Sequence, residues 1–459
     1  MAEAPGRATA SPSRDIAWQP VELTGWGRTA RARSIACRPA ADEDVLAALA
    51  APDDDGFLAH GAGRSYGDAG LNDGGRALLT QDLAEPDSFD AESGHLVCNA
   101  GRTIDALMRS YLPRGYLCPV SPGTAFVTLG GALANDVHGK NHDRVGSFGA
   151  HVTWFDLALP SGEVRRVSPE ADPELFAATV GGIGLTGIVL RLCLRMMPLP
   201  SAWVVVRERR MAGLEEFMAA LAEARDGATF SVGWIDALAG GRRLGRGILE
   251  TAEFLAEERS PMAPRRVRDF PFEAPAALLN PLSIGLFNEA YFRRVPAAGR
   301  ERARPLDRFL YPLDSIGRWN RLYGRRGFYQ FQCVIPDAES ERGLLALLEA
   351  AGRARLGSFL AVLKTLGGAG PGHLSFPQRG FTLALDFPRR TRTQDLLARM
   401  ERIVLDHGGR VYLAKDATLS PEGFAAMYLK LDPFREVLAR VDPDARLQSD
   451  MARRLKIRI

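Results

Sequence analysis

Cysteine is scarce in this sequence of 459 residues. The five cysteines are scattered, odd in number and without any Cys-x-x-Cys pair, at positions Cys37, Cys98, Cys118, Cys193 and Cys333. This pattern argues against a disulfide framework or a zinc ribbon and fits a reducing compartment. Long apolar runs are also missing, because no window approaches the ~18 consecutive apolar residues of a membrane-spanning helix.

A signal peptide is not expected either. Residues 1–15 contain small residues and proline, without the basic stretch and the apolar run that such a peptide needs. We therefore expect a soluble protein that is cytoplasmic or peripheral to the inner membrane, and the periplasmic face stays open as an alternative.

An excess of one charge sign is missing as well. Lys and Arg number 58 against 55 Asp and Glu, and the resulting net charge of +3 argues for neither an acidic solvating protein nor a histone-like nucleic-acid binder. The chain has room for more than one hydrophobic core, so two domains are the starting expectation.

Glycine, by contrast, is abundant where strands are expected to end. It clusters at residues 60–68, 121–132 and 181–187. Because glycine permits positive φ and close backbone approach, the N–H groups of such loops can form a concave site for a pyrophosphate. Tight turns would explain one cluster alone, but three clusters favour a cofactor. None has the Gly-x-Gly-x-x-Gly spacing of a dinucleotide fold, and no Gly-Lys-Ser/Thr indicates a triphosphate site.

Hydrophobic patterns divide the chain into two regions. Short apolar runs predict strands at 187–194, 230–234, 329–335 and 381–387, and helices are expected at 42–51, 103–114, 214–224, 340–351 and 393–407. Pro198 and Pro200 indicate a domain boundary near residue 200. The second region predicts a sheet covered by helices on one face.

Residues 280–308 stand out between these strands, because they are first apolar and aromatic and then dense in arginine. They predict a long insertion. Its length and charge favour a solvated loop, and the alternative is a segment that rests on an anionic lipid surface.

Four motifs carry a family resemblance. They are Gly-Ala-Gly-Arg-Ser-Tyr-Gly-Asp at 61–68, Pro-Gly-Thr at 122–124 followed by two glycines at 130–131, Asp-Val-His-Gly-Lys-Asn-His at 136–142, and Gly-Ser-Phe-Gly at 146–149. These motifs resemble the FAD-binding domain of the vanillyl-alcohol-oxidase superfamily. The likeness continues at 309–314, 319–321, 329–332, 412–416 and 449–455, so it covers nearly the whole chain.

The resemblance implies an α+β protein with a two-domain PCMH-type FAD-binding fold, whose substrate domain is built on an antiparallel sheet covered by helices. We expect the FAD-binding domain at 1–200, the substrate-binding domain at 201–409 with the insertion at 280–308, and a C-terminal return to the FAD domain at 410–459. The most similar branch implies oxidation of the 2'-hydroxyl of a polyprenylphosphoryl-β-D-ribose to the 2'-keto sugar, the first half of epimerisation to the arabinose form.

Two other functions stay open. One is an alditol or sugar oxidase that uses dioxygen, and the other is a basic membrane- or nucleic-acid-binding protein without catalysis. For the leading function the expected partners are a polyprenylphosphoryl sugar, a quinone-like electron acceptor, a short-chain dehydrogenase that acts on the keto product, and an anionic membrane surface. Nucleic acid is not an expected partner.

The resemblance also implies site residues. We expect Lys415, His138 and Tyr66 to be catalytic, with Lys415 stabilising negative charge on the flavin and His138 able to accept a proton. Substrate binding is expected from Lys140, Trp234, Gln330, Gln332 and Lys364. The expected FAD contacts are Gly61, Ala62, Gly63, Arg64, Ser65, Tyr66, Gly67, Pro122, Gly123, Thr124, Thr128, Gly130, Gly131, Ala132, Asp136, His138, Gly139, Asn141, Gly146, Ile183, Gly187 and Tyr412.

Non-covalent FAD is expected from the residue at position 64. Many members of the superfamily attach FAD to a histidine at the position of Arg64, and arginine cannot form that bond. His138 and His142 could suggest a metal site by their spacing. Gly139 and Asn141 between them, and the lack of a neighbouring carboxylate or cysteine, argue against one, so no metal is expected.

Two residues differ from the pattern of mycobacterial-type members of that branch. These members carry a cysteine at the position of Ala384 and an asparagine at the position of Thr382. That cysteine is the one trapped by covalent nitroaromatic inhibitors, so we expect this chain to escape them. Thr382 leaves the identity of the sugar open.

Overall fold

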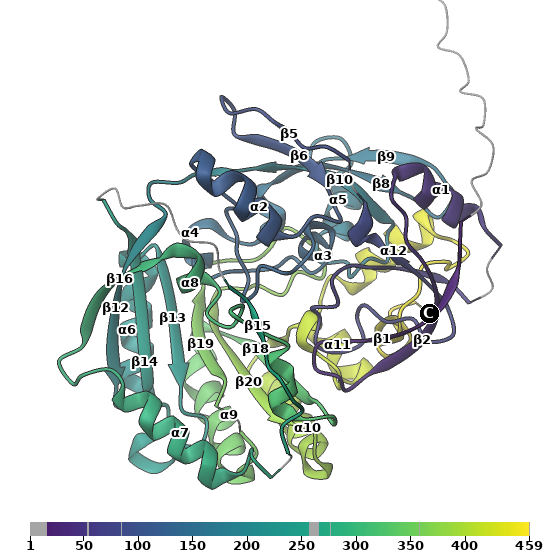
Figure 1. The fold of residues 1–459 in the computed structure, drawn as a ribbon. Helices are drawn as coiled ribbons and strands as arrows, with labels where there is room; N and C mark the ends of the chain where they lie inside the picture. The colour runs from purple at the N-terminus through teal and green to yellow at the C-terminus, as the bar shows by residue number, and fades with distance from the viewer. Residues whose placement is uncertain are drawn as a thin grey trace, which may run out of the picture.

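The computed structural model of the chain describes residues 16–52, 55–83, 85–256, 266–275, 277–357 and 359–458. The fold is α+β, and its sheets divide between two parts of the molecule, as Figure 1 shows. Within these ranges, no helix has both the length and the apolar character that crossing a bilayer requires.

The first part contains two main sheets. One has the order β1-β2-β4-β3, and the other is antiparallel with the order β5-β6-β10-β8-β9. The strands are β1 Gln19–Thr24, β2 Arg31–Cys37, β3 Phe57–His60, β4 Arg76–Leu79, β5 Ser88–Phe89, β6 His95–Asn99, β8 Val152–Ala158, β9 Val164–Val167 and β10 Ile188–Arg195. The helices between them are α1 Asp42–Ala50, α2 Ile104–Tyr111, α3 Leu129–Ala134, α4 His142–Val145 and α5 Pro173–Thr179.

Local sequence explains these elements. In β10 the apolar side chains at alternate positions, Ile188, Leu190 and Leu192, are buried, as the two-residue period of a strand requires. Thr103 caps the start of helix α2, because its hydroxyl accepts the N–H of Ala106 at 3.2 Å. The expected helices at 42–51 and 103–114 are therefore confirmed, although the last turn of the second is a 3-10 helix at Leu112–Arg114.

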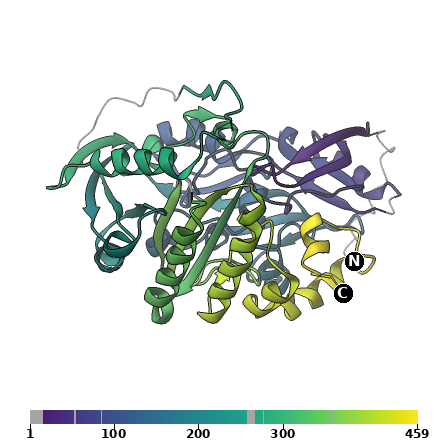
Figure 2. The ribbon, with the colours of Figure 1, turned by 90° about the horizontal axis from the view of Figure 1, so that it is seen from below.

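The second part contains one antiparallel sheet of eight strands in the order β16-β12-β14-β13-β19-β20-β18-β21. Their bounds are β12 Trp203–Met211, β13 Phe230–Ile235, β14 Gly247–Phe254, β16 Arg300–Pro305, β18 Phe328–Pro336, β19 Ala361–Leu366, β20 Gly380–Pro388 and β21 Arg410–Val411. Helices α6 Leu214–Gly227, α9 Ser340–Ala354 and α10 Thr391–Asp406 cover one face, and Figure 2 shows α9 and α10 side by side there. The expected helix-covered antiparallel sheet is confirmed.

The expectation of a solvated loop at 280–308 is wrong. These residues form helix α7 Pro281–Arg293, the edge strand β16 and most of helix α8 Leu306–Leu310. Strand β16 pairs with β12, and its alternate residues Arg300, Arg302 and Arg304 all contact the buried carboxylate of Glu208 at 2.7–3.1 Å. Ion pairs with that carboxylate, and of Arg304 with Glu250 as well, allow these partly exposed arginines to belong to an ordered strand.

The end of the chain packs against its beginning. After helices α11 Pro421–Met427 and α12 Leu431–Val441, Arg446 O accepts the N–H of Phe57 at 2.7 Å. In α13 Asp450–Arg454, Arg454 pairs with Asp68 at 2.7 Å and with Asp416 at 2.8 Å. Figure 1 shows these yellow helices beside the purple N-terminal strands. On these contacts we propose the division expected from the sequence, at 1–200, 201–409 and 410–459.

Candidate active site

A cavity of about 710 Å³ lies between the glycine-rich loops of the first part and the eight-stranded sheet. Its lining comes from segments as distant in sequence as Trp26, His138, Trp234 and Lys415. A volume of this order is in the range of ligand-binding sites. The cavity is therefore assembled by the tertiary fold.

The first glycine loop approaches other backbone segments too closely for larger residues. A Cβ added to Gly67 would lie 1.8 Å from Asp416 O, and Gly63 has a positive φ of 61°. Tyr66 N donates to Ala414 O at 2.9 Å, so this loop lies directly against the segment that carries Lys415. Strand β21 ends at Val411, and Lys415 lies in a 3-10 turn at Leu413–Lys415.

Most predicted site residues meet at this cavity. Its lining includes the three expected catalytic residues, the five expected substrate-binding residues and all expected FAD contacts except Ala132, Asp136, Asn141 and Gly146. These four lie behind the lining. Asp136, for example, is fully buried and accepts the Gly149 N–H at 2.9 Å and the Ser375 hydroxyl at 2.6 Å. Asp136 therefore holds two loops together rather than facing the cavity.

Several polar atoms of the lining are ready to bind a ligand. Among the described residues, Arg64 Nε, Ser121 Oγ, Asn135 Oδ1 and His138 Nδ1 are buried without a hydrogen-bond partner. Unpaired buried polar groups are costly, so each fits a role in holding a polar ligand. Together with the glycine loops, this mixed set of donors and acceptors fits a dinucleotide cofactor such as FAD.

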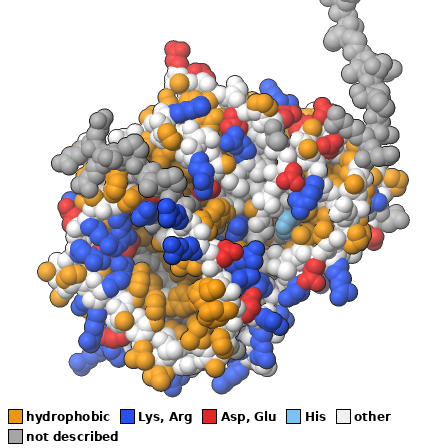
Figure 3. Space-filling view, in the orientation of Figure 1, with side chains coloured by type: hydrophobic (Ala, Val, Ile, Leu, Met, Phe, Trp, Pro, Cys, Tyr) orange, Lys and Arg blue, Asp and Glu red, His pale blue; other side chains and the backbone are white. Residues whose placement is uncertain are grey.

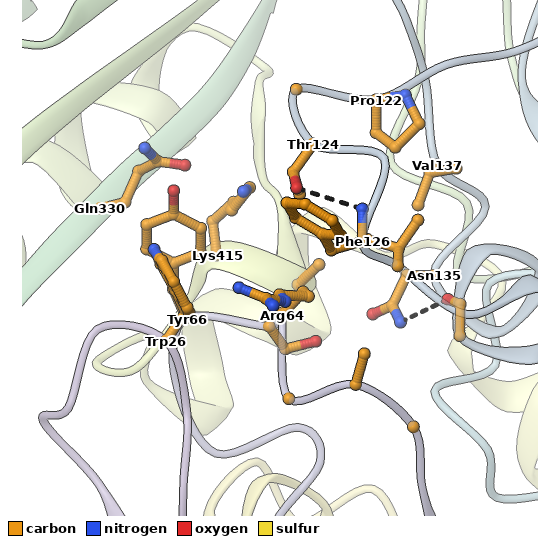
Figure 4. Close-up of a pocket in the computed structure, with 18 of the residues that line it drawn as sticks. Trp26, Arg64, Tyr66, Pro122, Thr124, Phe126, Asn135, Val137, Gln330 and Lys415 are labelled. Carbon is orange, nitrogen blue, oxygen red and sulfur yellow. Dashed lines mark hydrogen bonds between the residues drawn. The ribbon is translucent and has the colours of Figure 1, made fainter. Parts of the chain in front are cut away.

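Lys415 and Tyr66 lie against each other in the cavity wall. Lys415 Nζ lies 3.8 Å from the centre of the Tyr66 ring, and Figure 4 shows both side chains next to Gln330. Burial lowers the pKa of Lys415 to about 7, against the opposing effect of Asp386. A lysine with this pKa can hold or release a proton near neutral pH.

The buried carboxylate of Asp386, which was not predicted, interacts electrostatically with Lys415. This carboxylate accepts hydrogen bonds from Gln330 Nε2 at 2.6 Å and from the Tyr323 hydroxyl at 3.0 Å. Burial raises the pKa of Asp386 to about 7, although both hydrogen bonds lower it. A signal for it existed in the sequence, because Thr382, Ala384 and Asp386 alternate along one face of β20.

Two further lysines face the same cavity. Burial lowers the pKa of Lys140 to about 8 and that of Lys364 to about 8. Lys140 Nζ donates to Phe309 O, and its ammonium lies 4.2 Å from the centre of the Phe309 ring. Both lysines are mostly cationic at neutral pH, so the cavity favours an anionic ligand.

His138 is held as a neutral imidazole. Burial lowers its pKa well below the usual value, and nearby Lys364 adds to this effect. Gln332 Nε2 lies 2.9 Å from His138 Nε2 and 3.3 Å from Thr382 Oγ1, and with this amide orientation it donates to both. The proton of His138 then lies on Nδ1, so His138 offers an N–H hydrogen-bond donor at that atom. That tautomer weakens the expected role of His138 as a proton acceptor.

Arg64 lies in an aromatic setting that the sequence did not reveal. Its guanidinium lies 4.4 Å from the Trp26 ring centre and 5.3 Å from that of Phe126, and Figure 4 shows it between them. Burial lowers the pKa of Arg64, and Asp314 opposes this effect. Trp26 lies outside every predicted motif, whereas Phe126 lies within the 121–132 glycine cluster and Asp314 within the 309–314 stretch without having been assigned to the site.

The spacing of His138 and His142 produces no metal centre among the described residues, where no group of three or more potential ligands is found. Instead, His142 Nδ1 accepts the N–H of Gly367 at 3.1 Å. This hydrogen bond links His142 to the loop that follows β19 in the second part.

Comparisons with known proteins agree with this geometry. Residues 34–168 match the family described as FAD binding domain, and residues 380–455 match the family of D-arabinono-1,4-lactone oxidase. A decaprenylphosphoryl-beta-D-ribose oxidase of Mycolicibacterium smegmatis is 36% identical over 451 residues, which cover 95% of this chain and 97% of that protein. An uncharacterized protein of Streptomyces coelicolor, from the mprA 5' region, is 35% identical over 77% of this chain and 99% of its own length. Cytokinin dehydrogenase 2 of Oryza sativa subsp. japonica is 28% identical over 53% of this chain and 46% of its own length.

Proposed function

Because this chain belongs to the decaprenylphosphoryl-beta-D-ribose oxidase family, we propose that it oxidises the 2'-hydroxyl of a polyprenylphosphoryl-β-D-ribose to a 2'-keto group with FAD as cofactor. The observation that carries this proposal is the convergence of Lys140, Lys364 and Lys415 on one cavity beside the FAD-binding loops. An anionic sugar phosphate and a redox step on an alcohol both need cations there.

FAD is bound without a covalent link in this proposal. The expected contacts in the three glycine-rich segments surround the cofactor, and Arg64 occupies the position at which other superfamily members use histidine. Bound FAD would supply the two-electron acceptor for the alcohol carbon. Acid precipitation of the yellow protein should leave all flavin absorbance in the supernatant, and flavin that stays with the pellet would contradict non-covalent binding.

The hydroxyl proton goes to the neutral amine of Lys415. Burial keeps a substantial fraction of Lys415 unprotonated near pH 7, and the Tyr66 ring face then stabilises the ammonium that forms. His138 Nδ1 contributes a hydrogen bond from a neutral ring rather than a base. In its cationic form, Lys415 stabilises negative charge that develops beside it.

The substrate is held by the wall opposite the glycine loops. Lys364 and Lys140 hold the phosphate, while Gln330 and Gln332 hydrogen-bond the ribose hydroxyls. Trp234 donates its Nε1–H to Phe359 O at 2.9 Å, which fixes the indole so that its face can pack against the sugar.

The electron acceptor and the next enzyme belong to the same proposal. A quinone-like acceptor would take up the two electrons that bound FAD receives, and a separate short-chain dehydrogenase would reduce the keto product to the arabinose epimer. The test is product analysis: incubation with a polyprenylphosphoryl ribose and a quinone should give a product that lacks two hydrogen atoms, and borodeuteride should place deuterium at C2'. Deuterium at another carbon would contradict the proposed site of oxidation.

A sugar oxidase that uses dioxygen is the second candidate, because residues 380–455 match the D-arabinono-1,4-lactone oxidase family. This candidate predicts stoichiometric hydrogen peroxide during turnover in air without any quinone. The leading proposal predicts that turnover without a quinone is slow and that peroxide accounts for little of it.

A further inference from the structure

Exposed apolar side chains concentrate in one region of the surface. Of the eleven large apolar side chains that the described residues leave exposed, seven lie between residues 267 and 316. They are Val267, Phe272, Leu278, Leu282, Leu286, Phe287 and Ile316. Exposed apolar side chains that gather on the surface of a soluble protein indicate an interaction site.

Helix α7 is apolar on two faces. Ile284 is buried against the protein, whereas Leu282 is 73% and Leu286 is 65% exposed, one turn apart on the solvent side. A surface helix normally carries polar residues on that side. The helix is well formed, because Asn280 caps its start by accepting the N–H groups of Leu282 and Ser283.

This surface continues into the cavity. Tyr291 of α7 lies 4.7 Å from Trp234 between ring centres, and both residues line the cavity. Val267, which precedes strand β15 Arg268–Asp269, and Ile316, in the paired strand β17 Ile316–Gly317, are exposed and also line it. Figure 3 shows hydrophobic side chains gathered around a hollow in the lower part of the molecule, with Lys and Arg on either side.

Basic residues border the apolar surface. Arg355 lines a shallow depression together with Leu282 and Leu286, and no carboxylate among the described residues pairs with it. Arg266 and Arg268 are exposed on either side of Val267. An apolar centre with a basic border matches the surface of an anionic bilayer.

We propose that this region, the lipid face, docks on an anionic lipid surface and receives the polyprenyl tail of the substrate directly from it. The inference rests on the proposed function, because a cavity of about 710 Å³ that must hold FAD and a ribose phosphate leaves no room for a long polyprenyl chain. The tail therefore leaves through the opening beside Tyr291 and Ile316, where the exposed apolar side chains begin.

Vesicle flotation of the full-length holoprotein tests this proposal. Vesicles of phosphatidylcholine with phosphatidylglycerol should carry the wild type, and pure phosphatidylcholine vesicles should carry much less. The double variant Leu282→Ser with Leu286→Ser should bind at least about tenfold more weakly, because it removes two exposed leucines from the lipid contact. The matched control is Leu345→Ser with Leu429→Ser, whose leucines are exposed on other elements, at 43% and 85%. It should bind like the wild type.

Flavin reduction by a short-chain, water-soluble polyprenylphosphoryl ribose separates the two proposals. Both double variants should reduce at the wild-type rate, since neither changes the cavity. Equal flotation of the two double variants, or a wild type that does not float, would overturn the lipid face. The lipid face would also be overturned if gel filtration showed the wild type and the control variant as dimers and the Leu282/Leu286 variant as a monomer. No flavin reduction by the soluble substrate, with normal flotation, would instead reject the proposed function.

Discussion

Lys415 and Asp386 share one buried environment, and burial moves the pKa of both groups to about 7. Each group opposes the shift of the other, since Asp386 raises the pKa of Lys415 and Lys415 lowers that of Asp386. In the proposed chemistry only the neutral amine of Lys415 accepts the hydroxyl proton. Activity then depends on which of the two groups carries the proton near neutral pH.

The pH dependence of flavin reduction follows from this arrangement. Below the pKa of about 7, Lys415 is protonated, so the rate should fall about tenfold for each pH unit. Above it the rate should reach a plateau. Stopped-flow flavin absorbance under anaerobic conditions measures this profile, and a rate that is flat between pH 5.5 and pH 8.5, about 1.5 units on each side of 7, would exclude Lys415 as the base.

Asp386→Asn tests the positioning role of the carboxylate. The variant removes the charge that raises the pKa of Lys415, and its amide can still hydrogen-bond Tyr323 and Gln330. The midpoint of the pH profile should therefore move to lower pH. A purely structural role predicts a lower rate with an unchanged midpoint. Lys415→Met is the reference for complete loss of the base.

Covalent labelling at position 384 tests whether this residue faces the cavity. Ala384 lines the cavity opposite Gln332 in the β18–β20 register, and none of the five buried cysteines lines it. A nitroaromatic inhibitor of the covalent class should give no mass adduct with the wild type, whereas Ala384→Cys should gain one adduct per flavin. An adduct on the wild type would show that another nucleophile is accessible.

For single residues, the positions within the family motifs could be predicted, whereas the contacts that these residues make in the fold could not. The residues of the His-Gly-Lys-Asn-His motif were found by resemblance, yet only the structure shows that Asn141 turns away and donates to Pro119 O at 2.8 Å. The alternation along β20 places Asp386 on the face of Thr382 and Ala384, but its hydrogen bond with Gln330 and the approach of Trp26 to the cavity arise only in the folded chain.

Among the elements, the sheet edge at β12 and β16 depends on one carboxylate. Glu208 is fully buried and contacts Arg294 of the α7 C-terminus together with the three arginines of β16. The pKa of Glu208 lies below its usual value. Burial acts to raise this pKa, but Arg294 and Arg304 lower it by more, so the carboxylate stays charged. Its loss would leave Arg294 and Arg304 with Glu250 as their carboxylate partner and would remove the carboxylate that Arg300 and Arg302 contact.

Glu208→Gln should lower the free energy of unfolding by about 3–5 kcal/mol, because it removes one member of a buried charged network. Urea denaturation followed by circular dichroism measures the change. Glu301→Gln is the control, since its exposed pair with Arg207 should contribute no more than about 1 kcal/mol. Equal effects of the two substitutions would mean that the Glu208 network does not stabilise the edge.

Apolar periodicity predicted the elements that bury one face. In α9 the buried residues Leu344, Leu347, Leu348 and Ala351 repeat at helical spacing, and the helix expected there is confirmed. The method failed at 280–308 because charge was taken as a sign of exposure. The alternation of Arg300, Arg302 and Arg304 is a strand period, but its partner Glu208 lies about ninety residues earlier in the sequence.

For the whole molecule, the two parts are joined by polar contacts behind the cavity lining. Thr365 donates to Asp143, and Ser375 donates to Asp136 at 2.6 Å, so the substrate sheet is fastened to the segment after α3. The fold class followed from the pattern of strands and from resemblance. The pairing of these particular segments did not follow from the sequence, because it depends on polar contacts between residues more than two hundred positions apart.

Anaerobic titration of the yellow holoprotein tests the central claim most directly. A short-chain polyprenylphosphoryl ribose should bleach the flavin absorbance with one equivalent of substrate per flavin, and a free alditol at the same concentration should leave it unchanged. Bleaching by the alditol, with none by the polyprenylphosphoryl ribose, would contradict the account.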